Sequence, residues 1–403
     1  MVTRRPPLLY LTHRIPYPPN KGDKVRSFHI LRHLARTHRV FLGTFIDDPD
    51  DFRHLETLKE WCQGVRAIGI VPRLRRVASL RGLALGEALS LPYYRSRSLA
   101  RWAVETAVWE RIAVAVAFSG PMAQYLDVPG LTRRVIDFCD VDSAKWMEYA
   151  AAKRWPLAWL YRREGRRLAA FERAAALASD ASLFSTEAER ELFACAAPDA
   201  AGKATAMRNG VDAAYFSPDH ELPNPYPPGG PVLVFTGAMD YWPNIDAVRW
   251  FVREVLPLVR QRQAQARFWI VGRNPSPAVL DLAGEAVTVT GAVADVRPYL
   301  AHADVVEAPL HIARGIQNKV LEAMAMARPV VLAAASANGL AAKAGEECEV
   351  AARAEEFAAA TLRLLEDAGG RQRMGRLARE AMLARHDWEA NLAVLDRVLA
   401  GDG

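Results

Sequence analysis

Cysteine is scarce in this chain, and its positions show no ligand spacing. The four cysteines are scattered, with no Cys-x-x-Cys pair and no grouping with histidine: Cys62, Cys139, Cys195 and Cys348. This distribution argues against a zinc site or a disulfide framework and fits a reducing cytoplasm.

Long apolar runs are also missing. No uninterrupted apolar stretch approaches the roughly 20 residues that span a bilayer. Arg4 and Arg5 are followed only by the run Leu8–Leu11, which has the length of a strand and is too short for a signal-peptide core. We expect a cytoplasmic protein without a secretion signal, either soluble or peripheral at the inner face of the cell membrane.

Several common catalytic signatures are absent. The sequence has no G-x-S-x-G, which disfavours an α/β-hydrolase. It has no G-x-G-x-x-G and no G-x-x-x-x-G-K-[ST], so it supports neither a dinucleotide oxidoreductase nor a P-loop ATPase.

The 403 residues, 51% hydrophobic and 24% charged, are enough for two globular domains. Short apolar runs alternate with helical periodicities, such as those at Lys24–Arg36, Pro156–Ala178 and Asn244–Arg262, and this alternation predicts parallel sheets covered on both faces. The predicted strands are Leu8–Thr12, Val40–Phe45, Val65–Ile70, Ala113–Phe118, Arg134–Phe138, Ala181–Phe184, Ala204–Arg208, Val232–Thr236, Arg267–Val271, Val287–Thr290, Asp304–Glu307 and Pro329–Leu332. Two sheets fit the length better than one, with a boundary near Asn209–Asp212, before the Pro/Gly-rich loop 223–231.

The most informative stretch is Ala313–Val331, which reads as a glycine-opened loop, an amphipathic helix and a short apolar strand. The N–H groups at a helix start, with Lys319 beside them, suit an anionic phosphate. One turn further on, the Glu322 carboxylate can accept hydrogen bonds from the vicinal hydroxyls of a sugar. The segment therefore predicts a nucleotide-diphosphate pocket built from Gly315, Ile316, Gln317, Asn318, Lys319 and Glu322. The alternative is an ordinary buried helix with an i,i+3 ion pair.

Three further loops follow predicted strands, and ligands of parallel sheets bind at the carboxyl ends of strands. The first contains Gly22, Asp23 and Arg26, where we expect Asp23 to cap a helix; a capping role alone is the alternative. The second opens with Gly237, and the third contains Arg273, which could reach a phosphate or a base. Together with the Gly315–Glu322 segment they predict a phosphate-facing rim.

Candidates for acid/base chemistry are few. His13 directly follows the first predicted strand, although a lone histidine is more often structural than catalytic. Asp140, Asp142 and Lys145 follow a later strand, and His302 fits a helix surface. The Asp-x-Asp at Asp140–Asp142 lies outside the predicted rim, so we expect no metal there.

The net charge of +6 is unevenly distributed. Between Arg66 and Arg101 there are eight arginines and a single acid, Glu87, interleaved with leucine and aromatic residues. This composition is typical of a surface that lies on anionic headgroups or grips an anionic acceptor. A solvated basic loop region is the simplest alternative, and no motif supports nucleic acid as a partner.

Several of these segments resemble a known family. Gly315–Val331 resembles the donor site of retaining glycosyltransferases of family four, and Asn209–Asp212 with Phe216–Pro218 resembles their interdomain linker. More narrowly, the runs Pro16–Arg26, Ile136–Trp146, Gly237–Asn244 and Arg314–Ala325 resemble the sugar transferases associated with PEP-CTERM/exosortase exopolysaccharide loci.

The resemblance implies the GT-B fold, in which two Rossmann-like doubly wound domains face a cleft. It implies an acceptor-binding domain at residues 1–208, a nucleotide-sugar-binding domain at 209–385, and a last helix at 386–403, around Trp388, that crosses back to the first domain. In the family, the second of two glutamates seven residues apart holds the nucleotide ribose, and Glu322 matches it. The position of the first glutamate, nearer the donor sugar, is occupied here by Arg314.

We therefore interpret the sequence as that of a metal-independent hexosyltransferase. It would move a sugar from a nucleotide-diphosphate donor to a lipid-linked or glycan acceptor in exopolysaccharide biosynthesis, with His13, Asp23 and Arg314 as candidate catalytic residues. Retention of the anomeric configuration is implied by the resemblance alone. A sugar-nucleotide epimerase of the same shape, or a catalytically silent partner in polysaccharide assembly, stays open as an alternative.

Overall fold

A computed structural model describes residues 5–311, 315–337 and 339–401. The chain divides into two compact units, and each contains one parallel sheet. Unit 1 comprises residues 1–208 together with 392–403, and unit 2 comprises residues 209–391. The prediction of two parallel α/β sheets is confirmed.

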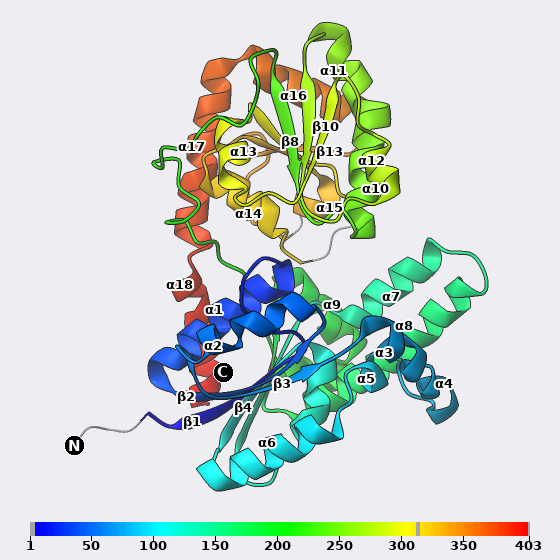
Figure 1. Ribbon diagram of the computed structural model, residues 1–403, viewed down its shortest axis with the longest axis vertical. Helices are drawn as coiled ribbons and strands as arrows, with labels where there is room; N and C mark the ends of the chain where they lie inside the picture. Colours follow the sequence, from blue (N-terminus) through cyan, green and yellow to red (C-terminus); the bar gives the residue numbers. More distant parts are fainter. Residues whose placement is uncertain (1–4, 312–314, 338, 402–403) are drawn as a thin grey trace. The chain divides into compact units, whose positions relative to one another are not determined.

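The sheet of unit 1 has seven parallel strands in the order β3-β2-β1-β4-β5-β6-β7 (Figure 1). Its central strands are almost entirely buried and apolar, as expected of a parallel sheet covered on both faces. The strands are β1 (Pro7–Thr12), β2 (Arg39–Ile46), β3 (Cys62–Gly69), β4 (Val114–Phe118), β5 (Arg133–Cys139), β6 (Ala181–Phe184) and β7 (Ala204–Ala206).

Helices connect these strands and cover the sheet. They are α1 (Gly22–Thr37), η1 (Pro49–His54), α2 (Leu55–Leu58), α3 (Pro72–Ser79), α4 (Arg81–Leu85), α5 (Ser90–Tyr93), α6 (Arg97–Glu110), η2 (Gly120–Tyr125), α7 (Asp142–Ala151), α8 (Leu157–Ala178), α9 (Glu187–Ala196) and η3 (Pro198–Lys203). The longest, α8, packs antiparallel to α7, and the two form a hairpin that projects from the unit (Figure 1).

The sheet of unit 2 has six parallel strands in the order β10-β9-β8-β11-β12-β13. They are β8 (Val232–Thr236), β9 (Arg267–Val271), β10 (Val287–Gly291), β11 (Val305–Ala308), β12 (Val330–Ala333) and β13 (Glu349–Ala351). Alternate residues of β8 enter opposite cores, because Leu233 and Phe235 pack with Phe251 on one face and Val234 packs with Met324 on the other. The unit is therefore a three-layer α/β/α sandwich.

The helices of unit 2 are α10 (Trp242–Trp250), η4 (Phe251–Val255), α11 (Leu256–Arg262), α12 (Pro277–Leu280), α13 (Arg297–His302), α14 (Asn318–Ala325), α15 (Ala334–Ala337), α16 (Ala354–Glu366) and α17 (Ala368–Arg385). The sequence predicted a single helix over Asn244–Arg262. The structure instead widens it to a π turn at η4, which ends two residues before Pro257, a residue that has no N–H to give to a regular α-helical hydrogen bond.

The chain between Arg208 and Val211 is fixed by the start of the last helix, α18 (Trp388–Ala400). Within unit 2, the Val211 N–H donates to the His386 carbonyl at 2.8 Å, and Gly210 lies so close to Trp388 that a Cβ there would fall 2.7 Å from its ring. From Leu392 onward α18 belongs to unit 1, where Arg133 donates to the Val398 carbonyl at 2.8 Å. The prediction that the last helix contacts the first domain is confirmed.

Two further details differ from the sequence prediction, one in unit 2 and one in unit 1. The strand β13 was missed because it is only three residues long and includes Glu349. Helix α1 begins at Gly22 after Lys21, so Asp23 lies inside its first turn and does not cap it.

Among the described residues, no helix has both the length and the apolar character that a membrane span requires.

Candidate active site

The first turns of α14 present a lysine and a glutamate at the carboxyl edge of the unit 2 sheet. Gln317 precedes the helix in an extended conformation, and its side chain does not cap the first N–H groups. Buried Ile316 packs with Val320 and Leu321 in the core below, which fixes the start of the helix on the sheet. Lys319 and Glu322 stay half-buried, one turn apart.

Lys319 is held in place by β8 and α10. Its Nζ donates to Asn244 Oδ1 at 2.7 Å and lies 4.1 Å from the centroid of the Phe235 ring. Asn244 in turn donates from Nδ2 to the Ala238 carbonyl at 2.8 Å, which fixes the orientation of its amide. Burial lowers the pKa of Lys319 to about 7, although the charge of Glu322 opposes the shift. The Lys319 amine therefore takes up a proton readily near pH 7 when an anion binds.

The Glu322 side chain is half-buried, one turn from Lys319. Its side chain makes no hydrogen bond within the part of the chain that the structure describes. Burial raises its pKa to about 7, and Lys319 works against that shift. Both oxygens can consequently accept hydrogen bonds from a ligand.

Two glycines bring the backbone close to Lys319. Gly237, at the end of β8, has φ +156°, and a Cβ there would lie 2.8 Å from Asn244 Nδ2 and 3.0 Å from Lys319 Nζ. Gly272, at the end of β9, has the same φ, and its Cβ would lie 1.6 Å from the Gly237 carbonyl oxygen. Both positions require glycine, because any side chain would displace the neighbouring strand-end loop or the lysine.

Arg273 completes this rim. Its backbone carbonyl accepts from the Met239 N–H at 2.8 Å, which joins the loops after β8 and β9. Its guanidinium is half-buried and makes no hydrogen bond or ion pair with any residue that the structure describes. We call the set of Gly237, Asn244, Gly272, Arg273, Lys319 and Glu322 the α14 rim.

A separate polar cluster lies at the end of β1 in unit 1. His13 Nε2 lies 3.2 Å from Asp23 Oδ2, and its ring is stacked on Phe118. Arg14 bonds both Asp23 and Asp47, the latter at 2.7 Å. Burial alone would raise the pKa of Asp23, but the hydrogen bond with His13 and the charge of Arg14 outweigh it and hold that pKa well below its usual range. Asp23 is therefore an anion that orients His13.

Arg26 has an internal role. It is only 2% exposed and forms an ion pair with Asp137 at 2.8 Å, while its Nη1 donates to the Met207 carbonyl. These bonds tie α1 to β5 and to the end of unit 1, so the proposed donor site does not include Arg26. Gly22, in contrast, is exposed at the first position of α1.

The remaining sequence candidates are dispersed. Asp140 accepts from Ser185 at 2.8 Å, Lys145 lies 3.9 Å from Asp142, and His302 is bonded to the Leu222 carbonyl at the end of α13. Among the described residues, no group of three or more His, Cys, Asp or Glu side chains could hold a metal ion. Arg314 lies outside the described residues.

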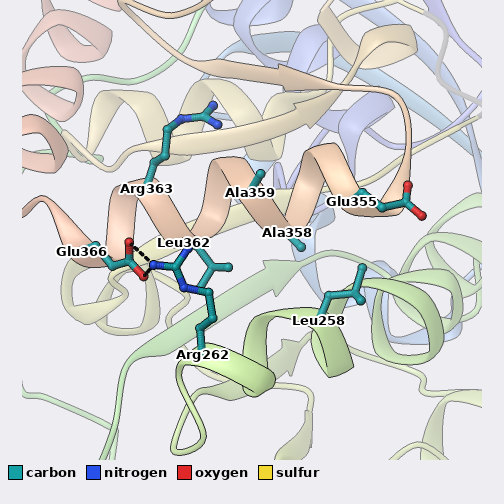
Figure 2. Close-up of a pocket in the computed structure, with 8 residues that line it drawn as sticks. All are labelled: Leu258, Arg262, Glu355, Ala358, Ala359, Leu362, Arg363 and Glu366. Carbon is teal, nitrogen blue, oxygen red and sulfur yellow. Dashed lines mark hydrogen bonds and ion pairs between the residues drawn. The ribbon is translucent and has the colours of Figure 1, made fainter.

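A hollow of about 320 Å³ lies elsewhere in unit 2, between α11 and α16. Figure 2 shows Arg262 and Glu366 paired across it, at 2.9 Å, with Leu258 and Leu362 on its walls. None of the residues of the α14 rim lines this hollow.

Residues 230–367, which carry the α14 rim, match the family model described as "Glycosyl transferases group 1". The chain is a glycosyltransferase. A search of curated proteins found no match to this sequence.

Solved structures of similar fold cover nearly the whole of this glycosyltransferase. HepE from Anabaena, in complex with UDP, is 16% identical with a TM-score of 0.67, over 98% of this chain and 99% of that one. Sucrose-phosphate synthase from Thermosynechococcus elongatus is 17% identical with a TM-score of 0.72, over 98% of each chain. WaaG, described as a glycosyltransferase involved in lipopolysaccharide biosynthesis, is 17% identical with a TM-score of 0.66, over 98% of this chain and all of that one. These likenesses confirm the GT-B-like fold.

Three residues of the site, Asn244, Gly272 and Phe235, were not predicted from the sequence, and Gly272 is recognised only by its close approach to Gly237. Asn244 was noticed only as the end of a glycine-opened run, and Phe235 only as a strand residue. Only their positions could have indicated that Asn244 and Phe235 belong to the site, since they lie on the first strand and the first helix of unit 2.

Proposed function

We propose that this glycosyltransferase moves a sugar, with retention, from a nucleoside-diphosphate donor to a lipid-linked or glycan acceptor in the synthesis of exopolysaccharide or another cell-surface polysaccharide. The observation that carries the donor assignment is the α14 rim. It places a half-buried lysine, an unpaired arginine and a helix start beside two glycines that let the loops after β8 and β9 pack closely together.

The diphosphate is the part of the donor that these groups suit. The first N–H groups of α14 lie at the carboxyl edge of the sheet, the Gln317 side chain does not cap them, and Lys319 lies one residue inside the helix. Arg273 adds a second cation that is free to bond phosphate oxygens, for which the planar guanidinium is well shaped. Glu322 would then accept the two ribose hydroxyls, as the likeness to family four implies.

Stabilising the leaving group is the main chemical task of this site. When the bond between the anomeric carbon and the β-phosphate oxygen breaks, the electron pair and negative charge pass to the diphosphate. Fixed N–H groups and the Lys319 ammonium stabilise that charge without a large rearrangement. We propose that these groups suffice and that no divalent metal takes part.

The uridine nucleotide is the first candidate for the base. HepE has been crystallised with UDP and with UDP-glucose, and its fold matches this chain over nearly its full length. We therefore propose a UDP-sugar as donor. The likeness to PEP-CTERM-associated sugar transferases and the match to WaaG favour a polysaccharide product.

We assign acceptor binding to unit 1, with the cluster at the end of β1 as its polar centre. Asp23 holds His13 from one side, and Phe118 and Tyr94 contact the imidazole ring. Gly22 is exposed at the start of α1. This assignment places His13 and Asp23 nearer the acceptor than the nucleotide.

Product analysis tests the proposal. The protein is incubated with UDP-sugars, with and without a lipid extract as acceptor, and nucleotide and sugar products are identified by mass spectrometry. Acceptor-dependent release of UDP with a glycosylated lipid supports the transferase. An altered UDP-sugar formed without acceptor would instead establish an epimerase, and no turnover of any donor would favour a silent assembly partner.

A further inference from the structure

Unit 1 carries an exposed surface that combines apolar and basic side chains. It is formed by α3, α4 and the first half of α8, together with the residues that precede each helix. Its exposed apolar members are Val71, Leu74, Val77, Leu80, Leu83, Leu85, Trp155, Leu157 and Trp159. Its exposed basic members are Arg73, Arg76, Arg81, Arg154, Arg162, Arg166 and Arg167. We call this set the basic apolar surface.

The part on α3 and α4 is unusually apolar for a solvent-facing helix. Leu74 and Val77, one turn apart, are 68% and 69% exposed. The same segment contains Arg73, Arg76 and Arg81, and the sequence from Val71 to Leu85 contains no acid. Such a segment has apolar groups to bury and positive charge to neutralise.

The part on α8 repeats this combination. Trp155 and Trp159 are 82% and 54% exposed, and Arg162 and Arg166 continue the same side of the helix at successive turns. A concavity of about 460 Å³ on α8 is lined by Trp159 and by four arginines, Arg162, Arg163, Arg166 and Arg167. Tryptophan beside arginine is typical of the interface between water and a bilayer.

The two parts are joined by Arg163. Its guanidinium donates to the carbonyls of Gly82 and Glu87 at 2.8 and 2.9 Å, which fixes α4 against α8. Glu164, the acid in this part of α8, is buried and accepts from the N–H groups of Leu89 and Ser90, so its charge does not offset the arginines. Figure 1 draws α3, α4 and α8 at one end of unit 1.

We propose that the basic apolar surface binds the protein to an anionic lipid bilayer, with the tryptophans and leucines inserted among the headgroups and the arginines bonded to lipid phosphates. Charge complementarity favours this occupant, because the segment Val71–Leu85 contains no acid and the single acid of Arg154–Arg167, Glu164, is buried. The exposed tryptophans favour a bilayer over an acidic protein, since they suit the headgroup layer. The proposal is independent of the donor site in unit 2.

Flotation with vesicles tests the proposal. The full-length protein is mixed with vesicles of phosphatidylcholine alone, or of phosphatidylcholine and phosphatidylglycerol in equal parts. The double variant Arg162→Glu/Arg166→Glu tests the charge, and Trp155→Ser/Trp159→Ser tests insertion. The controls are Arg373→Glu, an exposed arginine of α17, and Trp109→Ser, an exposed tryptophan of α6.

The parent is expected to bind the anionic vesicles at least about tenfold more tightly than the neutral ones. The arginine reversal is expected to weaken that binding at least about tenfold, from about 1 kcal/mol per basic residue near an anionic surface. The tryptophan variant should lose the binding that persists at high salt, and both controls should bind like the parent. Equal binding of the parent to both vesicle types, or variants that bind like their controls, would overturn the proposal. UDP affinity stays at the parent's value in both variants, which separates this test from that of the donor site.

Discussion

Replacing Lys319 by methionine removes the ammonium of the α14 rim while keeping most of the side-chain stem. In the parent, the ammonium is fixed 2.7 Å from Asn244 Oδ1 and 4.1 Å from the Phe235 ring centroid. It is therefore already in place for a diphosphate, and little side-chain entropy is lost when the nucleotide binds.

The expected loss of affinity follows from the kind of bond removed. A hydrogen bond to a charged group contributes about 1.5–3 kcal/mol, which corresponds to roughly 10- to 150-fold in Kd. We expect the loss of UDP affinity in Lys319→Met to fall in this range at about pH 7. The variant should keep the melting temperature of the parent or exceed it, because burial of the ammonium is unfavourable.

The pH dependence gives a second readout. A bound phosphate favours the charged lysine, whose pKa without ligand is about 7. Above that pH the parent must take up a proton to bind, so its affinity should fall by up to about tenfold per pH unit. The phosphate itself contributes little in this range, because its last pKa is about 6. In Lys319→Met the fall should be shallower.

Isothermal titration calorimetry with UDP, in buffers of different ionisation enthalpy, measures both affinity and proton uptake. Lys343→Met is the matched control, since Lys343 is an exposed lysine of unit 2 that pairs with Glu346 at 3.6 Å. If Lys319→Met binds UDP within about twofold of the control, with the same proton uptake as the parent, the proposed phosphate site is refuted.

Three other perturbations have defined outcomes. Glu322→Gln should weaken UDP binding more than dUDP binding in calorimetry, because the ribose 2′-hydroxyl loses a carboxylate acceptor; equal losses would contradict the ribose assignment. Gly272→Ala should lower the free energy of unfolding, measured by denaturant titration, by at least about 2 kcal/mol, because its Cβ would collide with the Gly237 carbonyl, whereas Gly284→Ala, with open space around it, should not. Glu307 is fully buried, and burial raises its pKa to about 8, so the folded state holds its proton more tightly than the unfolded state. Its contribution to stability is thus complete below about pH 4 and is lost as pH rises to about 8, by at most about 5 kcal/mol; chemical denaturation of Glu307→Gln across this range should show a flatter profile, and an unchanged slope would contradict the assignment.

Uniform apolar runs made most of the fold predictable from sequence. The strands β8 and β9 have the predicted bounds, because each is a continuous apolar run with a turn residue directly after it. The position of Lys319 and Glu322 on a helix that follows a strand-end loop was also predictable, since it depends only on local pattern.

Contacts between distant segments were not predictable. Arg26 looked like a ligand in a strand-end loop, but its partner Asp137 lies 111 residues further along the chain, and only the folded sheet brings them together. Asn244 fixes Lys319 across 75 residues. The basic composition of Arg66–Arg101 was visible in the sequence, whereas its continuation onto α8 through Arg163 required the structure.

Titration of the protein with UDP, GDP, ADP, TDP and CMP, without and with Mg²⁺, shows whether the α14 rim binds a nucleotide donor, with Glu322→Ala run in parallel. We expect one nucleoside diphosphate, UDP, to bind without added metal and Glu322→Ala to weaken this binding. Binding of none of the nucleotides, or equal binding by parent and variant, would contradict a donor site at the α14 rim.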